Sequence, residues 1–197
     1  AREPLQHLTG LAPFRHLELA VGPGVFVPRP ETETVAQFAV DALLADADPT
    51  PIGIDLCTGS GAIALAMATE VPHARVFAVE LSPDAHAWAA RNTADADNLT
   101  LVLGDLADTL GELDGTAAVV ISNPPYVPDD AIPRDPEVRL HDPSMALYGG
   151  PDGLDVVRVL SDRAMRLLRP GGLLVIEHGE LQGEQIRGLL TDDGWRA

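Results

Sequence analysis

The sequence predicts an α/β fold, with a doubly wound, mostly parallel sheet that a small β-hairpin precedes. Short apolar segments alternate along most of the chain with longer segments of helical periodicity. Apolar strands of this kind are typical of parallel sheets that helices cover on both faces. The unusual motifs of the chain also follow directly after these apolar segments. In a doubly wound sheet the carboxyl ends of the strands form the ligand crevice, so the position of the motifs supports the same fold class.

Length and composition favour a folded, soluble protein of one domain, or of one domain plus an appendage, without affinity for nucleic acid or membranes. The chain has 197 residues, and 46% of them are hydrophobic, which is enough for a buried core. Its formal net charge of −17 excludes generic binding to phosphate backbones and to anionic membrane surfaces, because both need clustered Lys and Arg. The single cysteine excludes an internal disulfide and favours a reducing compartment. No apolar segment approaches the ~18 residues of a transmembrane helix, so we expect a cytoplasmic protein.

Residues 1–34 are expected to form a β-hairpin and a linker, and residues 35–197 the main α/β domain. Apolar residues alternate between residues 14 and 21, and Gly22-Pro23-Gly24 separates them from a second short apolar segment. Alternation beside a Gly/Pro cluster is typical of a hairpin with its turn at the glycines. Helical spacing of apolar residues then predicts a helix over residues 31–45.

The main domain is predicted to alternate between strands and helices. A glycine turn begins the first helix, Ser82 and Pro83 cap the second, and Pro170-Gly171-Gly172 ends the third. The expected strands are residues 52–56, 75–81, 99–103, 116–122 and 173–177. The expected helices are residues 61–71, 83–95, 152–168 and 183–193. Residues 127–151 are rich in Pro, Asp and Gly and too long for an ordinary connection, so we expect a functional loop there.

A glycine-rich turn follows the first of these strands, in Asp55-Leu56-Cys57-Thr58-Gly59-Ser60-Gly61. Such a turn lets a ligand approach the backbone, and the helix behind it offers free N–H groups at its N-terminus. Cys57 stands where the first glycine of the full dinucleotide fingerprint would be. Alone, the motif is equally compatible with a nucleoside-cofactor site and with a structural turn.

Polar residues end the next two strands. Glu80 lies about twenty residues after the glycine turn, where a carboxylate can accept both ribose hydroxyls of a nucleotide cofactor. Asp105 and Leu106 follow the third strand, where a side chain could meet an adenine edge. A solvated strand end and a surface turn are the alternative interpretations of Glu80 and Asp105.

Asn123-Pro124-Pro125-Tyr126 follows the fourth strand and is the most informative motif. Its two prolines fix the backbone and remove two N–H donors, which leaves the Asn123 carboxamide and the Pro124 carbonyl as acceptors. Acceptors in this arrangement can bind both hydrogens of a planar NH2 group and hold its nitrogen in line with an electrophile. Tyr126 can cover or stack on the same group.

Other polar residues have simpler interpretations. His178 could act as a general base, but a strand-end histidine without a paired nucleophile is more often structural. Cys57 has no evident nucleophilic partner. The six histidines and the single cysteine show no metal-ligand spacing, so we expect no metal site.

Four segments of the chain together point to a known family. They are Phe26-Val27-Pro28-Arg29-Pro30-Glu31-Thr32-Glu33, Asp55-Leu56-Cys57-Thr58-Gly59-Ser60-Gly61-Ala62-Ile63-Ala64-Leu65, Ser122-Asn123-Pro124-Pro125-Tyr126 and Glu177-His178-Gly179. With these segments the chain resembles the PrmC/HemK family, S-adenosylmethionine-dependent methyltransferases that modify the glutamine of the Gly-Gly-Gln (GGQ) motif in peptide chain release factors. Asn-Pro-Pro-Tyr is shared with enzymes that methylate amino groups of DNA and RNA, whereas Pro-Arg-Pro-Glu-Thr-Glu is much more specific to this family.

The resemblance implies a Rossmann-like class I methyltransferase domain over residues 35–197, with S-adenosyl-L-methionine as cofactor and S-adenosyl-L-homocysteine as product. It implies that residues 57–61 wrap the methionine part of the cofactor, that Glu80 holds its ribose and that Leu106 lies by its adenine. The expected cofactor-binding residues are Asp55, Cys57, Thr58, Gly59, Ser60, Gly61, Glu80, Asp105, Leu106 and Asn123. The expected substrate-binding residues are Asn123, Pro124, Pro125 and Tyr126. The expected catalytic residues are Asn123, Pro124 and Tyr126.

The chain departs from the family pattern at two positions. Cys57 replaces the first glycine of the turn, which is tolerable if the backbone there does not need a positive φ. Leu106 replaces an aromatic residue often found beside the adenine, which is expected to weaken stacking on the cofactor. Family members also carry a helical N-terminal domain and two further strands, which we expect to be missing from these 197 residues.

Two alternative functions stay open. An amino-methyltransferase acting on an adenine or guanine exocyclic amine in DNA or RNA would use the same four residues, although the net charge argues against it. A cofactor-binding subunit without catalysis would not need Asn123 and Tyr126. The expected partner is the GGQ domain of a release factor. Because that domain works against ribosomal RNA and is expected to be basic, the net charge of −17 could steer it towards the enzyme.

Overall fold

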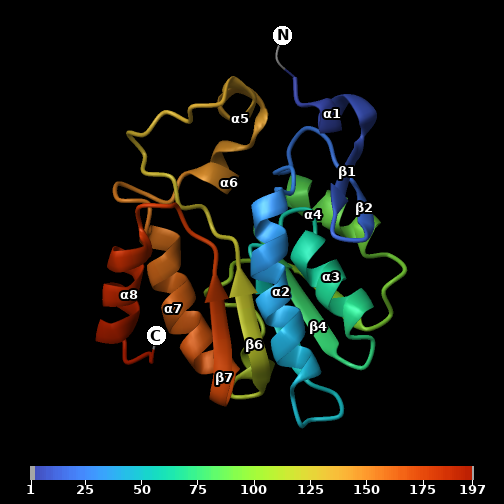
Figure 1. Cartoon of the computed structure of the whole chain (residues 1–197), viewed down its shortest axis with the longest axis vertical. Coiled ribbons are helices and arrows are strands. Elements are labelled where there is room, and N and C mark those ends of the chain that lie inside the picture. The colour runs from blue at the N-terminus through green and yellow to red at the C-terminus, as the bar shows by residue number, and fades with distance from the viewer. Residues whose placement is uncertain (1–2, 197) are drawn as a thin grey trace.

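A five-stranded parallel sheet forms the centre of the computed structural model, which describes residues 3–196 (Figure 1). Its strands are β3 (Ile52–Leu56), β4 (Arg75–Glu80), β5 (Leu99–Leu103), β6 (Ala117–Ser122) and β7 (Leu168–Ile176). They lie in the order β5-β4-β3-β6-β7, and every neighbouring pair is parallel.

The strand order reverses at β3. From β3 the chain runs outwards through β4 to β5 and then returns to place β6 on the other side of β3. A crevice forms at such a reversal, at the carboxyl ends of the two strands. The arrangement confirms the doubly wound fold class and places the turn after β3 beside the segment that follows β6.

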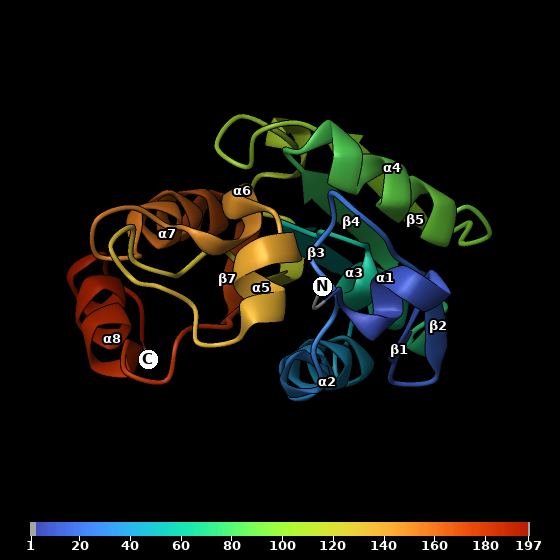
Figure 2. The same ribbon diagram turned by 90° about the horizontal axis from the view of Figure 1, so that it is seen from above.

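Helices cover both faces of the sheet, and each face has its own apolar core. One core includes α2 (Pro30–Leu44), α3 (Ala62–Glu70) and Ala85 of α4 (Pro83–Asn92), and the other includes α7 (Asp155–Leu167). Figure 2 shows α2 and α3 on one side of the sheet and α7 on the other. A smaller cluster joins α7 to α8 (Gly183–Asp192). The site is therefore carried by strands that are fixed from both sides.

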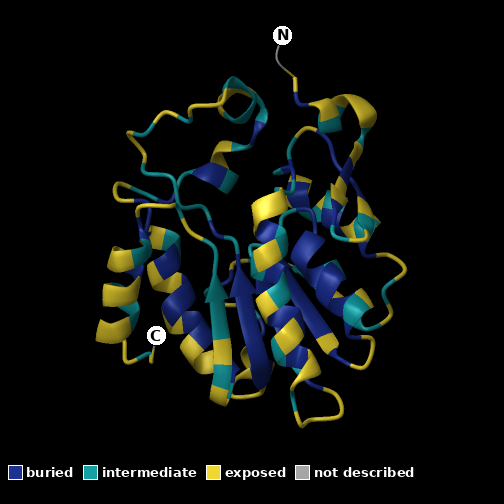
Figure 3. Ribbon diagram, in the orientation of Figure 1, coloured by how far each residue is buried: buried dark blue, intermediate teal, exposed yellow. Residues whose placement is uncertain are grey.

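Side chains of the central strands alternate between the two cores. Val76 and Ala78 of β4 pack with α2 and α3, whereas Phe77 and Val79 pack in the core that contains α7. β6 is buried along its whole length (Figure 3). A strand buried on both faces has apolar residues at successive positions, which explains why the sequence pattern predicts parallel strands.

A hairpin is present, but with other strands than the sequence predicts: β1 (Leu11–Phe14) pairs antiparallel with β2 (Leu17–Ala20), and residues 25–27 form no strand. The prediction of a turn at Gly22-Pro23-Gly24 is wrong, because the turn lies between the two strands at Arg15. Arg15 has a φ of 53°, its N–H donates to Glu33 Oε1 at 3.0 Å, and its Nη2 donates to Glu70 Oε2 at 2.7 Å. Contacts to α2 and α3 thus hold a turn that contains neither glycine nor proline.

β7 begins earlier than the sequence predicts. α7 ends at Leu167, and the strand starts at Leu168 and runs through Pro170-Gly171-Gly172. Its register shifts across this segment, since Leu168 pairs with Ala117 and Leu173 with Val119. β7 lies at the edge of the described sheet, where a proline and a bulge are tolerated. The predicted strand start at residue 173 is therefore wrong.

Four short helices are not among those predicted from the sequence. They are α1 (Leu5–Thr9), the 3-10 helix η1 (Gly111–Leu113), α5 (Pro136–His141) and α6 (Ser144–Leu147). The last two lie within the 127–151 loop, in which Val127 forms a bridge with Tyr148. The predicted boundary between residues 34 and 35 lies within α2, and the division into domains stays a prediction. No helix among residues 3–196 is both long and apolar enough to cross a membrane.

Replacing Leu160 with alanine should lower the free energy of unfolding by about 2–5 kcal/mol. Leu160 of α7 has no exposed surface and packs against the sheet, so its truncation removes apolar contacts and leaves a cavity. Urea denaturation followed by circular dichroism measures the change. Met165→Ala on the same helix is the matched control, because Met165 is 44% exposed. Equal losses in the two variants would contradict this assignment of the core.

Candidate functional site

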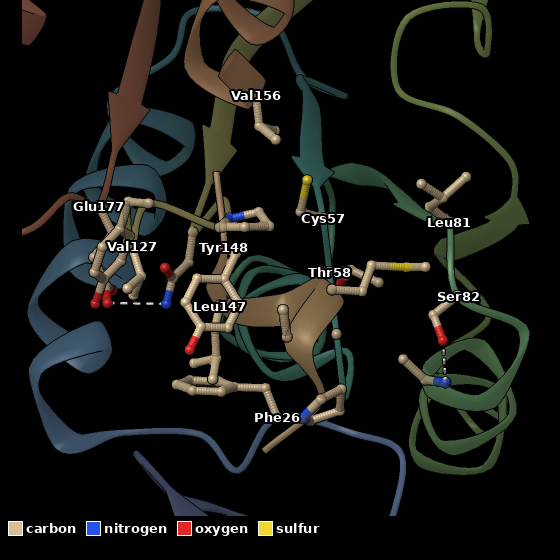
Figure 4. A pocket seen from close by; sticks show the side chains of 18 of the residues that line it. Phe26, Cys57, Thr58, Leu81, Ser82, Val127, Leu147, Tyr148, Val156 and Glu177 are labelled. Atoms are coloured by element: carbon tan, nitrogen blue, oxygen red, sulfur yellow. Dashed lines mark hydrogen bonds between the residues drawn. The ribbon is translucent and has the colours of Figure 1, made fainter. Parts of the chain in front are cut away.

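A cavity of about 1080 Å³ opens at the carboxyl ends of the strands (Figure 4). Its walls come from the segments after β3, β4, β5 and β6, from the 127–151 loop and from the segment before α2. The predicted site residues that line it are Cys57, Thr58, Gly59, Ser60, Glu80, Asp105, Leu106, Asn123, Pro125 and Tyr126. Those that are buried outside its lining are Asp55, Gly61 and Pro124.

Left-handed backbone positions build the turn after β3. The φ angles are 64°, 59° and 84° at Cys57, Gly59 and Gly61. Asp55 braces this turn from inside the protein: its Oδ2 accepts from Thr58 Oγ1 at 2.5 Å and from the N–H of Ala64 at 3.2 Å. Asp55 is fully buried, and burial raises the pKa of its carboxyl group to about 7. Asp55 thus fixes the shape of the turn without forming the wall of the cavity.

Cys57 occupies a backbone position that suits glycine. A left-handed φ costs a residue with a Cβ about 1 kcal/mol. From the sequence we expect cysteine to be tolerated at this position if the backbone does not need a positive φ. The structure does not meet this condition, because φ of Cys57 is 64°. Burial, with the charge of Glu80 beside it, raises the pKa of the thiol to about 12. Cys57 is therefore a neutral part of the cavity wall and not a nucleophile.

Glu80 ends β4 with its carboxylate fixed by two backbone groups. Oε2 accepts from the N–H of Gly59 at 2.8 Å, and Oε1 accepts from the N–H of Ser82 at 2.8 Å. Burial raises the pKa of Glu80 above its ordinary value, and the bonds from the backbone oppose that rise. Each carboxylate oxygen still has lone-pair capacity, so Glu80 is able to accept hydroxyl groups of a ligand in the cavity.

Asp105 and Leu106 line the cavity at the end of β5 in different ways. Asp105 is exposed, and its Oδ1 accepts from the N–H of Ala107 at 2.9 Å, which makes a local turn. Leu106 is only 8% exposed and packs in the core that contains α7. At the end of β5 a ligand can therefore contact the apolar side chain of Leu106 and the carboxylate of Asp105, but no aromatic ring.

Asn123 follows β6 and has its carboxamide held at one end. Its Nδ2 donates to Glu177 Oε1 at 2.9 Å, the bond dashed beside Glu177 in Figure 4, and to Thr32 Oγ1 at 3.4 Å. Within residues 3–196 no group donates to its Oδ1. Since Asn123 lines the cavity, this oxygen is available to a hydrogen-bond donor of a ligand.

Glu177 is a residue of the site to which the sequence assigns no role. It follows β7, and its N–H donates to the Ser122 carbonyl at 2.9 Å. Its Oε2 is buried and has no hydrogen-bond partner among the described residues. Burial raises the pKa of Glu177, while bonds from Thr32 and Asn123 oppose the rise. A carboxylate directly after an apolar strand is the signal that could have pointed to it.

The backbone of the Asn-Pro-Pro-Tyr segment is held by two other loops. The carbonyl of Tyr126 accepts from Nε2 of the buried Gln182 at 2.8 Å. A Cβ on Gly149 would lie 2.5 Å from the Pro125 carbonyl oxygen, and one on Gly153 would overlap the Tyr126 carbonyl. Glycine at these positions lets the loop pack directly on the segment.

Arg29 joins the segment before α2 to the 127–151 loop. Its Nη2 lies 2.7 Å from Oδ2 of Asp142, whose side chain has no exposed surface. The guanidinium also lies 4.8 Å from the centroid of the Phe26 ring. The sequence marks Arg29 only as part of a family signature. In the structure it closes one side of the cavity.

Comparison with known proteins supports the same fold. A family model described as "Methyltransferase domain" matches residues 54–134. The SAM-dependent methyltransferase from Agrobacterium tumefaciens is 17% identical with a TM-score of 0.58, over 83% of this chain and 50% of that one. TYW2 of P. horikoshii, solved in complex with MeSAdo, is 13% identical with a TM-score of 0.59, over 93% of this chain and 60% of that one. At such identities the likeness concerns the fold alone.

Curated proteins match at much higher identity. The release factor glutamine methyltransferase of Streptomyces coelicolor is 54% identical over 99% of this chain and 70% of its own length. The release factor glutamine methyltransferase of Bifidobacterium longum is 49% identical over 100% of this chain and 70% of its own length. The 4-amino-L-phenylalanine/4-methylamino-L-phenylalanine methyltransferase of Streptomyces pristinaespiralis is 41% identical over 98% of this chain and 67% of its own length. By these matches the chain belongs to the family of release factor glutamine methyltransferases.

Proposed function

We propose that this protein transfers a methyl group from S-adenosyl-L-methionine to the side-chain amide nitrogen of the glutamine in the GGQ motif of a peptide chain release factor. The observation that carries the proposal is the carboxamide of Asn123. Its NH2 end is bound to Glu177, and its Oδ1 accepts no hydrogen bond within residues 3–196. Such an acceptor suits the NH2 group of a glutamine. The 54% identity to a release factor glutamine methyltransferase supports the choice of substrate.

The residues around β3 and β4 fit the cofactor. The left-handed turn at residues 57–61 lets a ligand approach the backbone, and Glu80 offers two fixed oxygens to ribose hydroxyls. Leu106 offers an apolar surface to the adenine. When bound, S-adenosyl-L-methionine supplies an electrophilic methyl group on a sulfonium sulfur. The contribution of the chain is recognition of the cofactor and orientation of the acceptor amide.

An amide nitrogen is a weak nucleophile because its lone pair is delocalised into the carbonyl group. Asn123 Oδ1 accepts one of its two hydrogens and orients the nitrogen, whereas Pro124, the second acceptor that the sequence predicts, is buried outside the cavity lining. This bond favours a pyramidal nitrogen with a more localised lone pair. Tyr126 covers the amide and excludes water. A strong general base is not required, since the amide proton becomes acidic once the new C–N bond forms and is lost to solvent when the product leaves.

Charge supports a basic protein as the partner. The chain carries 30 Asp and Glu against 13 Lys and Arg. A field of this sign attracts a basic domain and repels free nucleic acid. It therefore favours a release factor over DNA or RNA as the methyl acceptor.

A methyl-transfer assay with labelled cofactor tests the substrate. The acceptors are a release factor, the same factor with its GGQ glutamine replaced by alanine, ribosomal RNA, DNA and 4-amino-L-phenylalanine. The small amine is included because a relative at 41% identity is named for it. We expect label in the release factor only when the glutamine is present. Label that enters only nucleic acid or only the amine would overturn the proposal.

Asn123→Ala should lower kcat on the order of ten- to a thousandfold, because it removes an acceptor aimed at the reacting amide. The Kd for the cofactor should change little, since Glu80 and the turn remain. Steady-state kinetics and isothermal titration calorimetry measure the two effects separately. Turnover equal to that of the wild type would rule out the assigned role.

Glu80→Gln should weaken cofactor binding about tenfold or more, because one carboxylate oxygen is replaced by a donor. In the wild type, affinity should also fall as the pH is lowered through the raised pKa of Glu80, since protonation removes acceptor capacity. Calorimetry across pH measures both effects. Asp55 is present in both proteins, but the charge of Glu80 contributes to its raised pKa, so the two affinities are compared above pH 7, where the Asp55 carboxyl is ionised in both.

The matched control for this experiment is Glu112→Gln, at an exposed position outside the cavity lining. Its affinity should follow the wild type at every pH. Identical profiles for the wild type and Glu80→Gln would show that Glu80 does not hold the cofactor.

A further inference from the structure

A carboxamide has two ends of nearly the same size and opposite hydrogen-bonding character. In the proposed reaction Asn123 must present Oδ1 to the substrate, because Nδ2 could only donate towards a group that is itself a donor. Nothing in the Asn-Pro-Pro-Tyr segment chooses between the two orientations. A partner outside the segment has to make the choice.

We propose that Glu177 is a positioning residue that fixes the carboxamide of Asn123 with Nδ2 against the carboxylate and Oδ1 towards the substrate amide. The inference rests on the proposed function, in which Oδ1 is the acceptor. It assigns Glu177 no contact with the reacting atoms.

The chemistry of a carboxylate makes this choice unambiguous. Ionised Glu177 has acceptors only, and its Oε1 receives Nδ2 of Asn123 at 2.9 Å. A flipped carboxamide would place two acceptors against each other and lose this hydrogen bond. Thr32 supports the same orientation only weakly, because it is a neutral hydroxyl and lies farther away, at 3.4 Å. Loss of a bond to a charged group disfavours the flipped form by about ten- to a hundredfold.

The backbone places Glu177 for this task. Ser122 pairs with Ile176 in the sheet, and the N–H of Glu177 donates to the Ser122 carbonyl at 2.9 Å. Asn123 and Glu177 are therefore the next residues of two parallel, hydrogen-bonded strands. Thr32, in the first turn of α2, is only 4% exposed and covers the pair from a third element.

Several titratable groups surround Glu177. Burial raises its pKa most, Glu31 raises it further, and His178 lowers it. Tyr126 lies close enough for Glu177 to raise the pKa of its hydroxyl in addition to the effect of burial. A protonated Glu177 would carry a donor and could accept either orientation of Asn123. Catalysis should therefore weaken as the pH falls through the raised pKa of Glu177.

Three variants test the proposal on the whole chain. Glu177→Ala should lower kcat about ten- to a hundredfold, because Asn123 loses the partner that orients it. Glu177→Gln keeps the size of the side chain but offers both a donor and an acceptor, so kcat should fall by a smaller factor than in Glu177→Ala. The pH profile of its kcat should also lack the decrease at low pH that protonation of Glu177 causes. The Kd for the cofactor should stay within about twofold of the wild type, since Glu80 and the turn are unchanged. Glu180→Gln, exposed in the same loop, is the matched control and should behave as the wild type.

A second readout needs neither cofactor nor substrate. Hydrogen exchange of the Asn123 side-chain NH2 group, followed by 15N NMR, should be slow in the wild type and faster in Glu177→Ala. This measurement tests the contact between Asn123 and Glu177 without any methyl transfer. If the wild type methylates no release factor, the proposed function fails, but the contact can still be judged from the exchange rate.

Three outcomes would overturn the inference. They are a kcat of Glu177→Ala equal to that of the wild type, a Glu177→Gln variant with wild-type kcat at every pH, and a loss of cofactor affinity as large as the loss of kcat. The last would mean general damage to the cavity instead of a misplaced carboxamide. If Glu177→Ala does not fold, Glu177→Gln and its exchange rate decide the question.

Discussion

The parallel register of β3, β6 and β7 is the constraint on which the site depends. Leu56 pairs with Ser122, and Ser122 pairs with Ile176. The next residues along the three strands are Cys57, Asn123 and Glu177, so the glycine turn, the acceptor carboxamide and its carboxylate partner all leave the sheet at one level. A slip of one residue in either pairing would turn a side chain to the opposite face and separate the group from its partner.

This edge of the sheet concentrates buried negative charge. Burial raises the pKa values of Asp55, Glu80 and Glu177, which means that the fold disfavours their ionised forms. Hydrogen bonds offset part of the cost, but Asp55 Oδ1 and Glu177 Oε2 are buried with no partner among residues 3–196. An unpaired buried oxygen destabilises a protein. The two apolar cores on either side of the sheet supply the stability that makes such a site possible.

The sequence predicts those features that depend on local pattern. Alternating apolar strands and helices identify the fold, and motifs after the strands identify ten residues of the cavity wall. It misplaces the turn at Arg15 and the start of β7, because contacts to α2 and α3 and pairing with β6 override the local signals of glycine and proline. It also assigns no role to Glu177, since only the pairing of two strands distant in the sequence brings that carboxylate to Asn123.

Recognition of an NH2 group does not by itself select a substrate. An amide and an aromatic amine both carry an NH2 group with two N–H hydrogens, and relatives named for each kind of substrate are 54% and 41% identical to this chain. Discrimination must therefore come from the rest of the cavity wall. Segments 24–32 and 131–148 supply that wall, and the pair of Arg29 with Asp142 ties them together. Ile132 and Met145 line the cavity and are 72% and 56% exposed, so they offer apolar surface there to a bound polypeptide.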